Sequence, residues 1–160
     1  MHTSFPTDTP SRGFVEDHFN VQDYDVPPRG APESLHRFNR ANGYEVGRGV
    51  WTQDLFAGRF GSKNMCGGYA IFDAGAELPC HTHEYDESIT IVEGMATCHC
   101  AGAKYQLSNF DTVCVPRGRP HRFINSGSTP MQMVWVYAGD EPDRVVVDQS
   151  LCELGGESDV

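Results

Sequence analysis

The sequence predicts an all-β protein in which short strands form a sandwich or a barrel. From about residue 46 onward, short runs rich in aromatic and β-branched residues alternate with turns of Gly, Pro, Asn and Asp, as is typical of such folds. The 17 glycines and 10 prolines favour many turns over long helices. This part of the sequence shows no pattern of a helix with three turns. The length of 160 residues suits one domain with its own hydrophobic core.

The strands are predicted from eight runs of sequence. In chain order these runs are VGRGVWTQDL (46–55), CGGYAIFDAG (66–75), ESITIVEG (87–94), MATCHCAGAKYQL (95–107), DTVCVPRG (111–118), HRFINSG (121–127), MQMVWVYAG (131–139) and RVVVD (144–148). They define a barrel domain over residues 46–147. The polar, Pro-punctuated residues 1–45 are predicted to form an irregular N-terminal arm, and residues 148–160 a loose tail.

Alternation along two of these runs assigns side chains to faces, because successive residues of a strand point to opposite sides. Glu87, Ile89 and Ile91 share one side of their strand. Met131, Met133, Trp135 and Tyr137 share one side of another. The opposite faces also carry apolar residues, such as Val92. We therefore expect both faces to be covered, as in a barrel that also forms a homodimer.

Charge and composition exclude several classes of protein. A formal net charge of −10 argues against nucleic acid and anionic membranes as partners. No stretch approaches the roughly 20 apolar residues of a transmembrane helix, and the N-terminus does not resemble a secretory signal. We therefore expect a cytoplasmic protein whose six cysteines are reduced thiols. Two of these, Cys98 and Cys100, are interpreted as small residues on one face of a strand.

Candidate metal ligands gather in the stretch CHTHEYDE, residues 80–87. His81 and His83 stand two residues apart, so on a strand their imidazoles project from the same face. Glu87 follows after a bend, and a hairpin-like return could bring its carboxylate to the same point. His121, in the stretch PRGRPH, is a fourth candidate. Imidazole and carboxylate ligands together suit a divalent transition metal.

Two stretches resemble the conserved motifs of the cupin family. GAELPCHTHEYDESITIVEG, residues 75–94, resembles the first motif, Gly-x5-His-x-His-x3-Glu-x6-Gly, at every defined position. PRGRPHRFIN, residues 116–125, resembles the second, Pro-x-Gly-x2-His-x3-Asn. The chain departs from the family in one place: Phe110 stands where a glycine is usual, six residues before the proline. We expect Asn109 or Asp111 to make that turn instead.

This resemblance implies a double-stranded β-helix, the cupin or jelly-roll barrel of two antiparallel sheets. It also implies one divalent ion per chain, held by His81, His83, Glu87 and His121, with iron, manganese, nickel and zinc as candidate metals. We expect Phe123, Met133, Trp135 and Tyr137 to line a substrate pocket and Tyr69 to lie at its mouth. A catalytic acid or base is not assigned.

The resemblance allows several activities, because one fold serves many functions. The hypothesis we favour is a metal-dependent enzyme acting on a small oxygenated organic molecule, with a preference for dioxygenase chemistry. A second is a non-redox isomerase, lyase or decarboxylase acting on a sugar or keto acid. A third is a cupin that binds a small ligand without catalysis.

Overall fold

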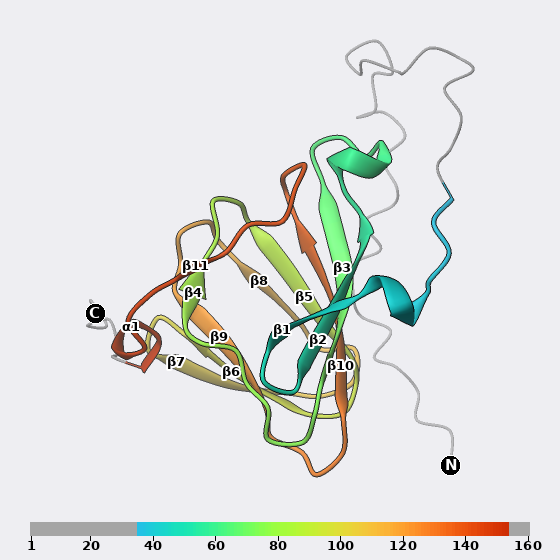
Figure 1. Cartoon of the computed structure of the whole chain (residues 1–160). Coiled ribbons are helices and arrows are strands. Elements are labelled where there is room, and N and C mark those ends of the chain that lie inside the picture. Colours follow the sequence, from blue (N-terminus) through green and yellow to red (C-terminus); the bar gives the residue numbers. More distant parts are fainter. Residues whose placement is uncertain (1–34, 154–160) are drawn as a thin grey trace, which may run out of the picture. The chain divides into compact units, whose positions relative to one another are not determined.

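The protein folds into two antiparallel sheets that enclose a common core. A computed structural model describes residues 35–153 of the chain, and Figure 1 shows their arrangement. The strands are β1 (Tyr44–Gly47), β2 (Val50–Phe56), β3 (Cys66–Phe72), β4 (His81–Thr82), β5 (Glu87–Glu93), β6 (Ala96–Cys100), β7 (Ala103–Leu107), β8 (Thr112–Val115), β9 (His121–Asn125), β10 (Met131–Tyr137) and β11 (Val145–Val146). One sheet has the order β1-β2-β3-β10-β5-β8, and the other β11-β4-β9-β6-β7. The predicted jelly-roll barrel is therefore confirmed.

The core lies between the two sheets, where the inward faces of the strands meet. Strands β5 and β10 alternate between buried and half-buried residues along their length. Ile89 and Ile91 are fully buried, as is Met131 at the start of β10. Burying apolar side chains in this way is the main force that holds such a barrel together. The face assignment made from alternation is thus correct for both strands.

A glycine on β3 makes room for the largest core side chain. Gly68 pairs in register with Trp135 of β10. A Cβ atom at residue 68 would lie 2.2 Å from Cζ2 of the Trp135 ring, closer than any real contact. The indole ring therefore lies against the backbone of β3 at Gly68, and a larger residue at position 68 would displace it.

The tight turns of the barrel are made by residues with positive φ angles, and one of these residues differs from the expectation. Gly75, Gly94 and Gly118 all have positive φ angles, as expected for tight turns. The turn before β8 is made by Phe110 itself, which has a φ of 69°, and not by Asn109 or Asp111. The expectation was wrong because Phe110 takes the left-handed backbone conformation of the usual glycine. Its amide still donates a hydrogen bond to the carbonyl of Ile91.

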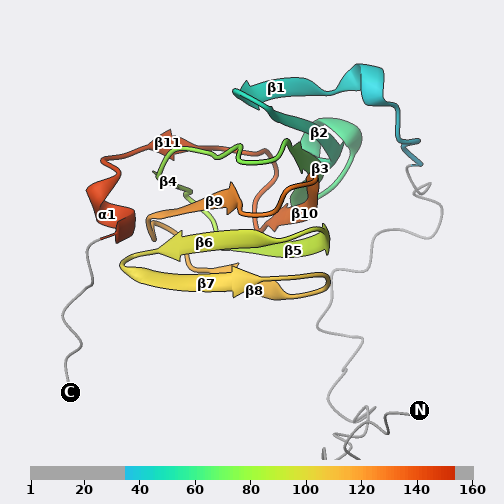
Figure 2. The same cartoon turned by 90° about the horizontal axis from the view of Figure 1, so that it is seen from below.

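The end of the described chain is fixed to the barrel by a disulfide. Residues 150–153 form the short helix α1 (Ser150–Glu153), which lies beside the β6–β7 hairpin in Figure 2. Its Cys152 is bonded to Cys80, and both cysteines are fully buried. The expectation of six reduced thiols was therefore wrong for this pair. Part of the segment predicted as a loose tail is ordered, while residues 154–160 lie outside the described residues.

The first strand of the described residues follows a short irregular segment. Strand β1 begins at Tyr44, two residues before the predicted start. Before it, residues 35–43 contain one 3-10 turn, Arg40–Asn42, and a second such turn, Gly58–Phe60, follows β2. The rest of the predicted arm, residues 1–34, lies outside the described residues. Among residues 35–153, no helix has the length and apolar character needed to cross a membrane.

Candidate metal centre

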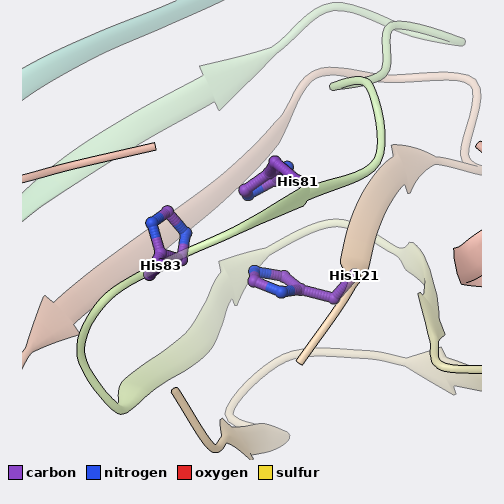
Figure 3. A group of neighbouring side chains, drawn as sticks. All are labelled: His81, His83 and His121. Carbon is purple, nitrogen blue, oxygen red and sulfur yellow. The ribbon is translucent and has the colours of Figure 1, made fainter. Parts of the chain in front are cut away.

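Three histidines in or directly after two neighbouring strands turn their rings toward one point inside the barrel. His81 lies in β4, His83 follows directly after it, and His121 opens β9, whose first residue pairs in register with His81 (Figure 3). One ring nitrogen of each histidine lies within 4.8 Å of the others. All three side chains are buried, at 3% exposure or less. The structure thus brings together the three histidines that the motifs singled out.

Backbone carbonyl groups determine which nitrogen each ring presents. The Nδ1 atoms of His81 and His121 lie 2.7 Å and 2.9 Å from the carbonyl oxygens of Pro79 and Arg119, two residues back along the chain. Nδ1 of His83 lies 2.5 Å from the carbonyl oxygen of Asp143. A carbonyl oxygen only accepts hydrogen bonds, so each Nδ1 carries a proton. In the neutral ring the lone pair is then on Nε2, and Nε2 is free to bind an ion.

Glu87 completes the group from the first position of β5. Its Oε2 lies 2.8 Å from Nε2 of His121 and 3.4 Å from Nε2 of His83. The carboxylate is only 6% exposed. A buried carboxylate facing two nitrogen lone pairs at these distances is repelled unless a positive charge lies between them. That charge is either protons on the imidazoles or one shared cation.

Protonation differs among the residues of the site. Burial disfavours the charged form of His83, but its hydrogen bond with Glu87 outweighs burial and raises the pKa of His83. Burial and, to a smaller extent, the neighbouring His121 lower the pKa of His81 to about 3, so this ring is neutral in the cellular pH range. Burial raises the pKa of Glu87, but its hydrogen bonds with His121 and His83 outweigh this effect and hold it at about 2. The site therefore offers a permanent carboxylate and at least one neutral imidazole.

The donor set fits a divalent transition metal. Three imidazole nitrogens and one carboxylate oxygen suit iron, manganese, nickel or zinc. Hydrogen bonds from the far nitrogen of each histidine to a carbonyl are characteristic of metal sites, because they fix the orientation of the rings. His81, His83, Glu87 and His121 would hold the ion.

A cavity of about 250 Å³ opens onto this group. His81 and Glu87 form its buried end, and the exposed Arg144 lies at its mouth. Four of the five predicted pocket residues line it: Phe123, Met133, Trp135 and Tyr137. They do so because they lie on the inward faces of β9 and β10.

Tyr69 does not line the cavity, so the prediction that it lies at the mouth of the pocket was wrong. It alternates with Gly68 and Ala70 on β3, so its ring lies on the outer face of the sheet. There it makes an edge-on contact with Phe38 at 5.6 Å between ring centroids. Its hydroxyl donates a hydrogen bond to Oε1 of Gln132 on the neighbouring strand. The alternation in CGGYAIF already held this information.

The hydroxyl of Tyr137 lies beside the histidines. It is 3.3 Å from Nε2 of His83, and the two rings are 4.5 Å apart. Burial and the nearby Glu87 carboxylate raise the pKa of Tyr137 far above its usual value. This phenol therefore keeps its proton and can act as a hydrogen-bond donor toward a ligand at the centre.

Sequence reasoning missed the segment that closes the mouth of the cavity. Pro142, Asp143 and Arg144 all line the cavity. The Asp143 carboxylate accepts a hydrogen bond from the backbone of Glu84, and its carbonyl orients His83. The backbone carbonyl of any residue at this position could orient His83. The contact joins residues 60 positions apart, and no local motif signals it.

Comparison with known proteins agrees with this fold. Residues 68–137 match the family model described as the cupin domain. No match was found among curated proteins. Among solved structures, KdgF from Halomonas sp. is 18% identical, with 69% of this chain and 97% of that chain covered and a TM-score of 0.58.

Two further structures show the same fold. The polyketide cyclase RemF from Streptomyces resistomycificus is 17% identical, with 74% of this chain and 90% of that chain covered and a TM-score of 0.58. An oxalate oxidase is 18% identical, with 74% of this chain and 66% of that chain covered and a TM-score of 0.63. The family match over residues 68–137, the likenesses in fold and the two antiparallel sheets together support a small domain of the cupin superfamily in this chain.

Proposed function

We propose that this protein is a metal-dependent enzyme that acts on a small oxygenated organic molecule, with dioxygenase chemistry as the favoured reaction. The observation that carries the proposal is the set of three Nδ1-anchored histidines beside the buried Glu87 carboxylate. Such a group suits a shared metal cation, and it lies at the end of a cavity large enough for a small molecule. Solved structures of similar fold include enzymes, among them an oxalate oxidase and a polyketide cyclase.

The residues of the chain would divide the work at this site. The three histidines and Glu87 would hold one divalent ion, which would supply Lewis acidity and a binding position for substrate oxygen atoms. Tyr137 would donate a hydrogen bond to the bound substrate, because its hydroxyl keeps its proton. The apolar cavity wall would exclude water and favour the entry of dioxygen, which is itself apolar.

A second candidate is a non-redox reaction, such as isomerisation or decarboxylation of a keto acid. The position of the Tyr137 hydroxyl favours it, because this group lies 3.3 Å from Nε2 of His83 and can donate a hydrogen bond to a developing anion. A structure of similar fold is an oxalate decarboxylase from Lactobacillus farciminis, 14% identical, with 66% of this chain and 33% of that chain covered and a TM-score of 0.60.

Metal content is the first test of the site. We expect the full chain, purified without added metal, to hold about one divalent transition-metal ion per chain, as measured by elemental mass spectrometry. His81→Ala, His83→Ala and His121→Ala should each lose it. His99→Ala is the matched control, because His99 is half-buried on β6 and is not part of the group. Metal content equal to that of the wild type in all three variants would exclude this site.

The two reactions differ in their need for dioxygen. Under the favoured proposal, a screen of diketones, catechols and hydroxy acids should reveal substrate consumption that stops without dioxygen. Turnover that continues anaerobically would support the non-redox candidate instead. Metal-loaded protein that binds a ligand without turning it over under either condition would support the non-catalytic binder.

A further inference from the structure

The cavity wall between the metal centre and the mouth offers almost no free hydrogen-bonding group. It is formed by aliphatic and aromatic side chains, among them Val50, Phe72, Ile89, Phe123 and Met133. All of these are at most 4% exposed to solvent. A ligand that enters the cavity therefore meets a wall that can form dispersion contacts but cannot replace hydrogen bonds to water.

The two polar groups set into this wall already have partners. Thr52 lines the cavity, but its hydroxyl donates to the carbonyl of Tyr69 at 3.1 Å. The same hydroxyl accepts a hydrogen bond from the indole N–H of Trp135 at 3.2 Å. The Trp135 donor is thereby used as well. Both side chains present mainly carbon atoms to a ligand.

The remaining polar groups lie at the two ends of the cavity. At the buried end are His81, Glu87 and Tyr137. At the mouth are Asp143, Arg144 and Tyr44, which is 50% exposed. This separation suits a ligand with a polar head at the centre and an apolar body along the wall. A ligand with hydroxyl groups along its whole length would bury them without partners, which is costly for each group.

We propose that the substrate is a small oxygen chelator, such as a 2-oxo acid, whose body is apolar and free of hydroxyl groups. The oxygen atoms of the head would bind at the metal centre, so this inference rests on the function proposed above. The volume of about 250 Å³ limits the body to the size of a phenyl ring or a branched alkyl group. Sugars and sugar acids are then excluded as substrates.

Two 2-oxo acids of similar size test this inference. Both share the 2-oxo acid head. Phenylpyruvate has an aromatic body, whereas the body of 2-ketogluconate carries several hydroxyl groups. Both are titrated by calorimetry into the full chain, loaded with zinc under anaerobic conditions because zinc has no redox chemistry. We expect phenylpyruvate to bind at least about tenfold more tightly, since unpaired buried hydroxyl groups weaken binding by this order each.

The outcomes separate the inference from the proposed function. Equal or tighter binding of 2-ketogluconate would overturn the inference that the substrate body is apolar. Failure of both compounds to bind would overturn it as well. Neither result would change the metal content measured for the proposed site. Equal affinity of phenylpyruvate for the zinc-loaded wild type and for metal-free His81→Ala would overturn the chelating head, and with it the function proposed for this site.

One substitution on the wall adds a direct check. Val50→Thr places a hydroxyl on the cavity wall with little change of shape, and it should reduce the preference for phenylpyruvate several-fold. Val134→Thr is the matched control, because Val134 is half-buried on the outer face of β10 and does not line the cavity. If folded Val50→Thr keeps the same preference for phenylpyruvate over 2-ketogluconate, the apolar wall is not the source of that preference. If Val50→Thr does not fold, the ratio measured for the wild type decides alone.

Discussion

Hydrogen bonds to three carbonyl oxygens prepare the histidines before any ion is bound. For His81 and His121 the acceptor is the residue two positions back, so the local chain orients the ring by itself. For His83 the acceptor is Asp143, which belongs to a different part of the barrel. The spacing of the motif predicts which residues meet. It does not predict which nitrogen they present, because that depends on carbonyl groups that every residue has.

At the scale of single residues, Phe110 is predicted to cost stability. Its φ of 69° is unfavourable for any residue with a Cβ atom, and its side chain is 78% exposed, so little packing offsets the strain. Phe110→Gly should raise the free energy of unfolding by about 0.5–1 kcal/mol, the strain relieved less the entropy that glycine adds to the unfolded chain. Denaturant unfolding measures this change.

The matched control for this substitution is Phe110→Ala, which removes the ring and keeps the Cβ atom. It should show no such gain. If alanine stabilises the protein as much as glycine does, the exposed aromatic ring and not the backbone is the source of the effect.

Among the elements, α1 depends on one covalent link. The Cys80–Cys152 disulfide closes a loop with a sequence separation of 72 residues, and near it Arg122 forms ion pairs with Glu77 and Glu153. Because a loop this long strongly restricts the unfolded chain, Cys152→Ser should lower the free energy of unfolding by about 2–4 kcal/mol. The measurement uses metal-free protein, since a bound ion would add its own stabilisation.

Cys114→Ser controls for the loss of a thiol, because Cys114 is exposed and unpaired in the described structure. A reducing agent should destabilise the wild type as much as the substitution does and leave Cys152→Ser unchanged. Equal stability of oxidised and reduced wild type would show that other contacts hold α1 in place.

The strands were readable from the sequence, whereas the contacts between distant segments were not. Alternation along β5 and β10 predicts their inward faces because the period of a strand is fixed. The Cys80–Cys152 pairing has no such signal, since connectivity cannot be deduced from cysteine positions. The positive φ of Phe110 was missed because a general rule pointed elsewhere. Aromatic residues rarely adopt a positive φ, so the rule favoured Asn109 or Asp111 as the turn residue.

For the molecule as a whole, a homodimer remains our prediction. The outer face of the six-stranded sheet carries half-buried apolar residues, with Trp51 opposite Ile71 and Tyr69 opposite Val134 in register. A second copy covering this face would bury them. We expect light scattering to give twice the mass of one chain, and Val134→Glu to shift the protein toward the monomer.

Val145→Glu is the matched control for that shift. Val145 is 54% exposed on β11, in the other sheet, so a charge there should leave the dimer intact. A monomeric mass for the wild type, or equal dissociation by both substitutions, would contradict a dimer formed through the six-stranded sheet.

The segment from residue 142 to 147 serves two purposes at once. It forms part of the cavity mouth, and it holds β4 through the pairs of Val145 with Thr82 and Val146 with His81. It also supplies the carbonyl that turns His83. Access and coordination therefore share one piece of the chain. An engineer who lengthened this loop to admit a bulkier compound would at the same time loosen one of the three imidazoles, so a wider entrance would come with a weaker hold on the ion.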